Sequence, residues 1–169
     1  MKIILESLEG LVILFFLSTY ACREILLNSD GGDIPYDDCG GLDGNQVAVV
    51  KLTGCETDEI CEIIMGKSLT LTINWKTIQN GIKALRSSLV LSLCNGFSMN
   101  VAIKPDNACD YLKCPIAKNS EIAYTGTFTV PEKFLPGSGR IMWHGFEKSE
   151  TDSLLCVDFR VNILAPTEK

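Results

Sequence analysis

The sequence predicts an all-β protein, an immunoglobulin-like β-sandwich of about seven strands. Two observations support this fold class: short runs in which apolar and polar residues alternate, and turn-forming residues between those runs. The sequence has no heptad pattern, no internal repeat and no convincing amphipathic helix. At 169 residues it has the length of one domain with a single core. Several short strands separated by turns are typical of two packed sheets.

Each expected strand has one apolar face that must meet the interior. In order along the chain, the strands are expected at residues 47–52, 68–75, 89–93, 97–104, 123–130, 141–146 and 157–163. The segment 97–104 has the clearest alternation. The apolar side chains on its one face are those of Phe97, Met99, Val101 and Ile103. This face is therefore expected to line the inside of the sandwich.

The two ends of the chain are assigned to segments outside the domain. Lys2 precedes the apolar run 11–17, and small residues follow that run, which is typical of a secretory signal peptide. The run is too short to span a bilayer, and a buried N-terminal helix is the alternative. We expect a signal peptide at residues 1–21, an acidic leader at 22–35, the domain at 36–165 and a tail at 166–169.

Charge and motif content argue against several classes of function. The formal net charge is −6, and the lysines and arginines are scattered singly, so nucleic acid is not expected as a partner. His144 is the only histidine, and the sequence has neither a nucleophile elbow nor a phosphate-binding glycine loop. We therefore expect neither enzymatic activity nor a cofactor.

Cysteine content indicates a disulfide framework in an oxidising compartment. The chain has eight cysteines behind the expected signal peptide. Cys55 with Cys61 and Cys109 with Cys114 are natural local pairs, but spacing alone leaves the connectivity open. A zinc site is the alternative, and the absence of any CxxC pair argues against it. We therefore expect no metal site.

A set of motifs extends over most of the chain. The set comprises DCGG at 38–41, the Cys55 and Cys61 pair, PDNAC ending at Cys109, CPI at 114–116, Tyr124, Trp143 and SLLCVDFRVNI ending at Ile163. This array resembles the ML lipid-recognition family, which includes Niemann-Pick type C2-like sterol carriers and group 2 mite allergens. The resemblance covers about residues 36–165. It implies a β-sandwich whose two sheets separate to hold a lipid in a cavity between them.

The resemblance also implies which residues contact the lipid. They are Phe97, Met99, Val101, Ile103, Tyr124, Phe128, Val130, Phe134 and Trp143. Val101, Val130 and Phe134 take the positions that form the pocket entrance in sterol carriers. Such a lining gains about 25 cal/mol for each Å² of apolar lipid surface that it removes from water. A solid, filled core is the alternative interpretation of the same residues.

Three disulfides follow from the resemblance. They are Cys39 to Cys156, Cys55 to Cys61 and Cys109 to Cys114. Cys94 has no partner in the family pattern. It could pair with Cys22, remain as a buried thiol or link two molecules, and we expect the buried thiol.

The sequence therefore predicts a secreted, monomeric lipid-binding or transfer protein. A sterol is the first expected ligand and a fatty acid or other small lipid the second, with transient membrane or receptor contact. The alternatives are a lipid-presenting recognition protein that acts with a receptor in innate immunity, and a fatty-acid or semiochemical carrier. Phe134 replaces the usual tyrosine of sterol carriers, which weakens the case for sterol selectivity. The absence of an N-glycosylation sequon favours extracellular fluid over the lysosome.

Overall fold

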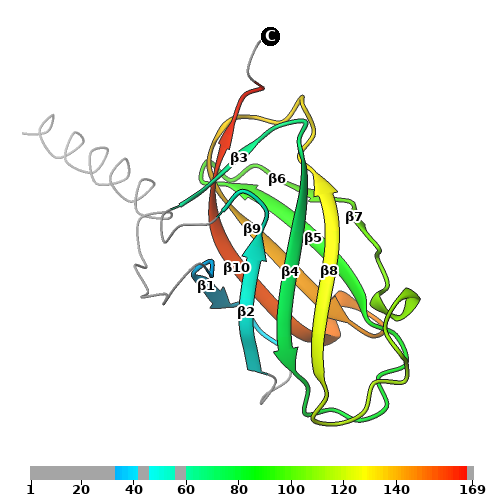
Figure 1. The fold of residues 1–169 in the computed structure, drawn as a ribbon. Helices are drawn as coiled ribbons and strands as arrows, with labels where there is room; N and C mark the ends of the chain where they lie inside the picture. The colour runs from blue at the N-terminus through cyan, green and yellow to red at the C-terminus, as the bar shows by residue number, and fades with distance from the viewer. Residues whose placement is uncertain (1–32, 42–45, 56–59, 167–169) are drawn as a thin grey trace, which may run out of the picture.

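The computed structural model describes residues 33–41, 46–55 and 60–166, and these residues form two facing β-sheets (Figure 1). The six-stranded sheet contains, in spatial order, β1 (Tyr36–Asp38), β10 (Ser153–Leu164), β9 (Gly137–Phe146), β5 (Arg86–Leu93) and β6 (Ser98–Val101), with β3 (Cys61–Ile64) parallel to β10. The four-stranded sheet contains β2 (Gln46–Leu52), β4 (Ser68–Lys76), β8 (Glu121–Thr129) and β7 (Ile103–Lys104). Two short 3₁₀ turns, η1 (Ala108–Asp110) and η2 (Glu150–Asp152), lie in the connections.

The all-β sandwich is confirmed, whereas the expected number of about seven strands is too low. The described residues form ten strands. β1 and β3, which have three and four residues, were not predicted. Runs this short contain too few residues to show a period of two. Both strands are held by backbone pairing to β10, which no local pattern reveals.

The segment expected as one strand at 97–104 forms two strands in different sheets. Val101 in β6 lies opposite Leu89 of β5, whereas Ile103 in β7 lies opposite Phe128 of β8. Exposed Ala102 lies between them, where the chain crosses from one sheet to the other. The alternation continues across this point because Val101 and Ile103 face the same interior. Periodicity therefore could not distinguish one strand from a strand that changes sheets.

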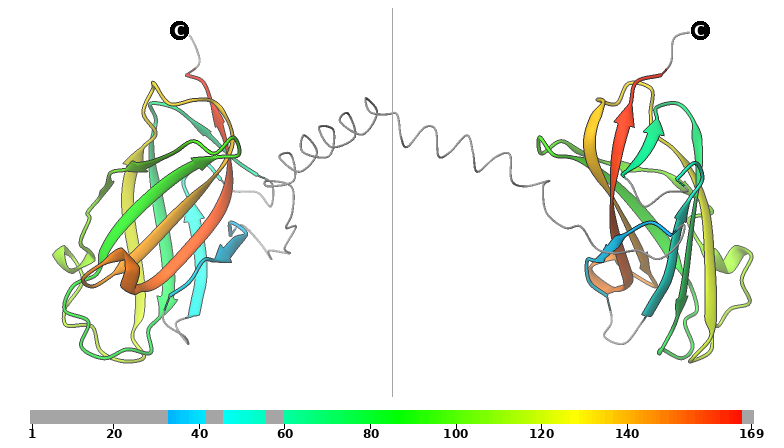
Figure 2. Two further views of the ribbon diagram at one scale, coloured as in Figure 1. Left: turned by 180° about the vertical axis from the view of Figure 1, so that it is seen from behind. Right: turned by 60° about the vertical axis from the view of Figure 1, so that its left-hand side comes forward.

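The interior lies between the two sheets, which face one another in the right-hand view of Figure 2. β4 and β8 pair over nine residues, and along both strands buried side chains alternate with more exposed ones. β5 and β9 show the same alternation in the facing sheet. The inner faces consist largely of leucine, isoleucine, valine and aromatic residues. Burial of these faces from water is the main force that holds the sheets together.

The structure contains the three disulfides that the resemblance implied, Cys39–Cys156, Cys55–Cys61 and Cys109–Cys114. Cys94 is also disulfide-bonded, so the expectation of a buried thiol is wrong. Its partner lies outside the described residues. Cys94 follows β5 in the turn to β6 and is only partly buried. A cysteine in such a turn is accessible to a second cysteine, unlike a thiol on an inner strand face.

The expected signal peptide at 1–21, most of the leader and the last three residues lie outside the described residues. The described end of the leader packs against the sandwich. Ile34 is buried, and its backbone N–H donates to the carbonyl oxygen of Val50 at 2.9 Å. Within the described ranges, we find no helix with the length and apolar character needed to cross a bilayer.

Candidate functional site

An open groove follows the edge of the sandwich where the chain crosses between sheets. Its volume is about 660 Å³, and it lies against β5, β6, β7 and the segment that follows. Four side chains from inner strand faces contribute to its wall: Ser87, Leu89, Val101 and Ile103. All four are buried, yet they border a groove that is open to solvent. The groove therefore runs close to the inside of the sandwich along this edge, and polar residues of the outer faces line it as well.

The predicted lipid-binding residues fall into three places. Val101 and Ile103 border the groove, and Phe128 lies opposite Ile103 in the β7–β8 pair. Tyr124 and Trp143 lie deeper and are fully buried. At the end of β8 where Thr129 lies, the rings of Phe97 and Phe134 are 5.4 Å apart.

The remaining predicted residues differ in burial. Val130 and Phe134 are buried, Met99 is partly buried, and Phe97 is 46% exposed. Phe97 precedes β6 rather than lying in a strand, so it does not belong to the inner face as expected. The structure thus places most of the predicted residues in or beside one interior. Their contact with a lipid stays a prediction.

Three aromatic rings pack in a row across the inside of the sandwich. Tyr124 of β8 and Trp143 of β9 have ring centroids 4.9 Å apart, and Trp75 of β4 lies 6.3 Å from Trp143. Trp75 was not among the predicted site residues. Its inward position in an alternating strand was the signal that could have identified it.

Two glycines make room for these rings. Trp143 lies over Gly145 of its own strand, where an added Cβ would come within 2.6 Å of the indole Cη2. The Tyr124 hydroxyl lies over Gly126. A Cβ at Gly126 would meet the tyrosine hydroxyl and would lie 2.8 Å from Ile103 Cγ1. The glycines therefore let both rings lie along the strand rather than stand away from it.

The Tyr124 hydroxyl belongs to a short hydrogen-bonded chain beside the groove. It lies 2.8 Å from the Ser87 hydroxyl and donates to the carbonyl oxygen of Pro105 at 3.2 Å. Burial raises the pKa of Tyr124, and its contacts with Ser87 and the Trp143 indole partly offset that rise. The Trp143 contact lacks the geometry of a full hydrogen bond, since Trp143 Nε1 has no hydrogen-bond partner. Trp75 Nε1 is likewise buried without a partner.

Comparison with known proteins identifies the family. The family model described as ML domain matches residues 33–163. The chain belongs to the ML domain family. Among its relatives, the mite group 2 allergen Der f 2 of Dermatophagoides farinae is 28% identical over 127 residues, which are 75% of this chain and 83% of the allergen. The mite group 2 allergen Gly d 2.02 of Glycyphagus domesticus is 33% identical over 100 residues, covering 59% of this chain and 75% of the allergen.

A solved structure shows the same fold. The crystal structure of a Niemann-Pick type C2 protein from the Japanese carpenter ant superposes on this ML domain with a TM-score of 0.65. The two sequences are 22% identical, and the match covers 77% of this chain and 99% of the ant protein. The resemblance found in the sequence is therefore confirmed at the level of family and fold.

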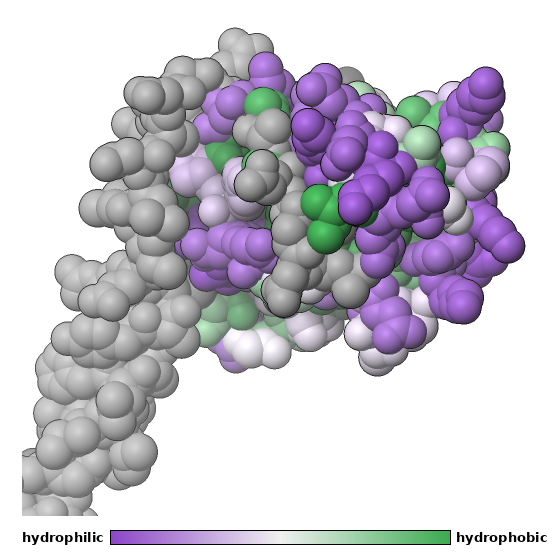
Figure 3. Space-filling model, turned by 90° about the horizontal axis from the view of Figure 1, so that it is seen from below, coloured by the Kyte–Doolittle hydropathy of each residue, from purple (hydrophilic) through white to green (hydrophobic). Residues whose placement is uncertain are grey.

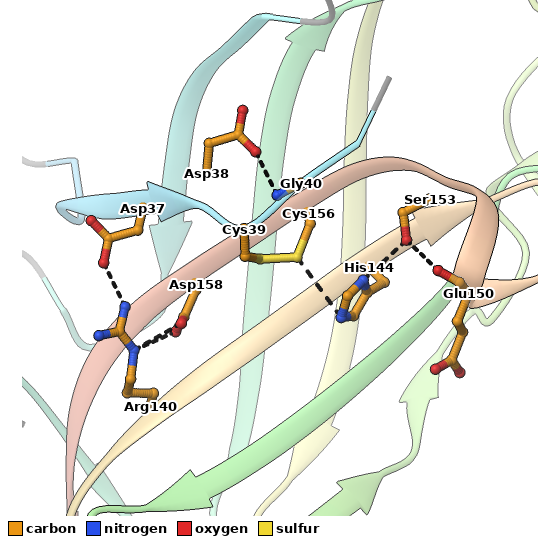
Figure 4. Close-up of a disulfide and its surroundings, with 10 residues drawn as sticks. All are labelled: Asp37, Asp38, Cys39, Gly40, Arg140, His144, Glu150, Ser153, Cys156 and Asp158. Atoms are coloured by element: carbon orange, nitrogen blue, oxygen red, sulfur yellow. Dashed lines mark hydrogen bonds and ion pairs between the residues drawn. A yellow bond between two sulfur atoms is a disulfide. The ribbon is translucent and has the colours of Figure 1, made fainter. Parts of the chain in front are cut away.

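His144 lies on the outer face of the ML domain, at the disulfide that joins Cys39, just after β1, to Cys156 of β10 (Figure 4). Its Nδ1 is 3.1 Å from the Ser153 hydroxyl, and its Nε2 is 3.8 Å from Cys156 Sγ. Ser153 donates its hydroxyl proton to the carbonyl oxygen of Glu150 at 2.6 Å. A serine nucleophile would instead direct that proton to the histidine. The described contacts therefore form a structural cluster over the disulfide.

No group of three or more potential metal-binding side chains occurs within the part of the chain that the structure describes. The site thus combines apolar contact from the interior with polar and charged residues along the groove, among them Lys104, Asp106 and Glu150.

Proposed function

We propose that this ML domain binds a small lipid between its two sheets and carries it through water. The observation that carries the proposal is the groove of about 660 Å³, which borders buried residues of the sandwich interior. Transfer of a lipid's apolar surface from water to such a lining is favourable, at about 25 cal/mol per Å². A sterol is the first ligand class and a fatty acid or another small lipid the second.

The edge at the groove is the part of the sandwich that opens most easily. β7 pairs with β8 over two residues, Ile103 and Lys104, and β6 pairs with β5 over four. By contrast, β4 and β8 pair over nine residues in the middle of their sheet. Separation of the sheets at β7 therefore breaks few backbone hydrogen bonds. The packed rings of Tyr124 and Trp143 lie directly behind this edge and would move apart as a lipid enters.

Exchange of the lipid involves contact with a membrane or a receptor. Phe97 and Leu135 are 46% and 48% exposed, and Phe97 packs against Phe134 at the end of β8. The opposite end, seen from below, presents mainly hydrophilic residues among those described (Figure 3). The exposed side chains of Phe97 and Leu135 are thus suited to contact an apolar partner. In this proposal the protein is secreted, monomeric and without enzymatic activity.

The test combines ligand identification with a matched pair of variants. Protein secreted from a eukaryotic host is extracted, its co-purified lipids are identified by mass spectrometry, and binding of a fluorescent sterol and a fluorescent fatty acid is measured. Val101→Asp places a charge at the groove and should weaken binding at least tenfold, because the carboxylate loses water when the lipid enters. Thr129→Asp, on the exposed face of β8, should bind as wild type does.

Circular dichroism spectra of both variants, compared with the wild-type spectrum, serve as the control for folding. A wild-type protein that carries no lipid and binds neither probe would contradict the proposal. So would equal binding by Val101→Asp and Thr129→Asp.

A further inference from the structure

Two buried indole N–H groups inside the sandwich lack a hydrogen-bond acceptor. Trp75 and Trp143 are 2% and 0% exposed, and neither Nε1 atom has a partner. Most buried polar groups in proteins are paired, because a buried donor without an acceptor is costly. Two such donors in one interior therefore mark a place that is suited to receive an acceptor from outside the chain.

These donors lie on a continuous path from the groove. Ser87 borders the groove and contacts the Tyr124 hydroxyl at 2.8 Å. The Tyr124 ring packs on Trp143 at 4.9 Å, and Trp143 packs on Trp75 at 6.3 Å. Trp143 Nε1 has a weak contact with the Tyr124 hydroxyl, whereas Trp75 Nε1 has no hydrogen-bond partner. Trp75 is therefore the stronger donor for an incoming group.

The charges of the described residues limit what that group can be. The polar or charged residues that are buried are Thr77, Ser87 and Asp158. Asp158 is bound by Arg140 on the outer face of the six-stranded sheet. Lys104, beside the groove, is exposed. Arg160, whose Nη2 is buried without a hydrogen-bond partner, lies opposite Arg140 on the same outer face. Lys76, which lines a second groove together with Trp75, is exposed. The cations of the described residues thus lie off the inner strand faces, and an ionised carboxylate there would lose its water without gaining a counter-ion.

We propose that the preferred ligand is an uncharged oxygenated lipid, such as a long-chain alcohol, ketone, ester or sterol, whose oxygen accepts a hydrogen bond from Trp75 Nε1. This inference rests on the proposed lipid-binding function and adds to it the polar group that the interior selects. The oxygen lies within the sandwich, and the ionised form of a fatty acid is disfavoured.

The test is a cycle of two ligands and two proteins. Dissociation constants of oleyl alcohol and 9-octadecene are measured for wild type and for Trp75→Phe, which keeps an aromatic ring but lacks the N–H. The substitution should weaken alcohol binding about fivefold more than alkene binding, the effect of one lost hydrogen bond. For each ligand, the dissociation constant of Trp75→Phe is divided by that of wild type. Comparison of these two ratios cancels the different hydration of the alcohol and the alkene. Phe128→Leu, which shortens an inner side chain without a polar atom, should weaken both ligands by the same factor.

A spectroscopic readout on the wild-type protein covers the case in which Trp75→Phe does not fold. The chain has two tryptophans, so its ¹H–¹⁵N spectrum contains two indole N–H signals. Oleyl alcohol should shift the Trp75 signal downfield, and 9-octadecene should not. Oleate should bind more weakly than the alcohol at pH 8 and more tightly as the pH falls.

Three results would overturn the inference. They are equal weakening of both ligands by Trp75→Phe, an indole signal that responds alike to alcohol and alkene, and oleate binding at pH 8 that equals alcohol binding. Absence of binding to every ligand is a distinct result, because it refutes the proposed function itself and the inference with it.

Discussion

Arg140 connects three strands of the six-stranded sheet on its outer face. From β9 it donates through Nε to Asp158 of β10 at 2.8 Å, and through Nη2 to Asp37 of β1 (Figure 4). The hydrogen bond to Asp158 is the main reason that the pKa of Arg140 is raised. A raised pKa means that the stabilisation is complete below the ordinary arginine pKa and is lost only at higher pH. Arg140 itself therefore introduces no pH dependence near neutrality.

Arg140→Met should lower the free energy of unfolding by about 1–3 kcal/mol, because it leaves Asp158 with 11% side-chain exposure and no cation. Lys51→Met is the control. The Lys51–Asp33 pair has an N–O distance of 3.6 Å and a lysine side chain that is 60% exposed, so its loss should cost less than about 0.5 kcal/mol. Denaturant unfolding measures the change in the free energy of unfolding for both variants. Equal changes would mean that the Arg140 contacts stabilise the protein no more than an exposed ion pair does.

Gly126 provides a second test at the level of single residues. Gly126→Ala should destabilise the protein by about 1–3 kcal/mol, because the new methyl group meets the Tyr124 hydroxyl and Ile103. In a Tyr124→Phe background the same change should cost less, since the hydroxyl is gone while the Ile103 contact remains. Unfolding of the four proteins in this double-mutant cycle gives the coupling. Strict additivity would show that the tyrosine hydroxyl does not lie against Gly126.

At the level of elements, the sequence predicted strands where long alternating runs exist and failed where pairing alone defines the strand. β4 and β8 were recognised because one face is buried along their whole length. β1 and β3 were missed because their stability comes from β10, which is distant in sequence. The break at Ala102 was missed because both sheets face one interior, so the burial pattern is unchanged when the chain leaves one sheet for the other.

The disulfides differ in how much chain they close, and their removal should differ accordingly. Cys39–Cys156 spans 117 residues, whereas Cys109–Cys114 spans 5. Loop-closure entropy gives about 4–5 kcal/mol for the first and about 2 kcal/mol for the second. Replacement of each pair by alanine, followed by denaturant unfolding, should therefore show about a twofold difference. Similar losses in the free energy of unfolding would mean that contacts in the folded state, rather than the entropy of the unfolded chain, determine how much each disulfide stabilises the protein.

For the whole molecule, the fold followed from the sequence more fully than the site did. Alternation and the family resemblance led to the sandwich, and they placed Val101, Ile103, Tyr124 and Trp143 beside one interior. The groove could not be predicted, because it depends on where the chain crosses from β6 in one sheet to β7 in the other. The unpaired indole of Trp75 could not be predicted either, since a sequence does not show whether a buried N–H finds an acceptor.

The central claim is that a lipid lies between the two sheets, and tryptophan quenching tests it most directly. Both tryptophans of the chain are buried in that interior, so a lipid bound there lies close to both rings. The measurement is a titration with a dibrominated long-chain alcohol, with the non-brominated alcohol of equal length as control. We predict saturable, one-to-one quenching by the brominated lipid alone. Binding without quenching would place the lipid outside the sandwich, and no binding would contradict lipid carriage altogether.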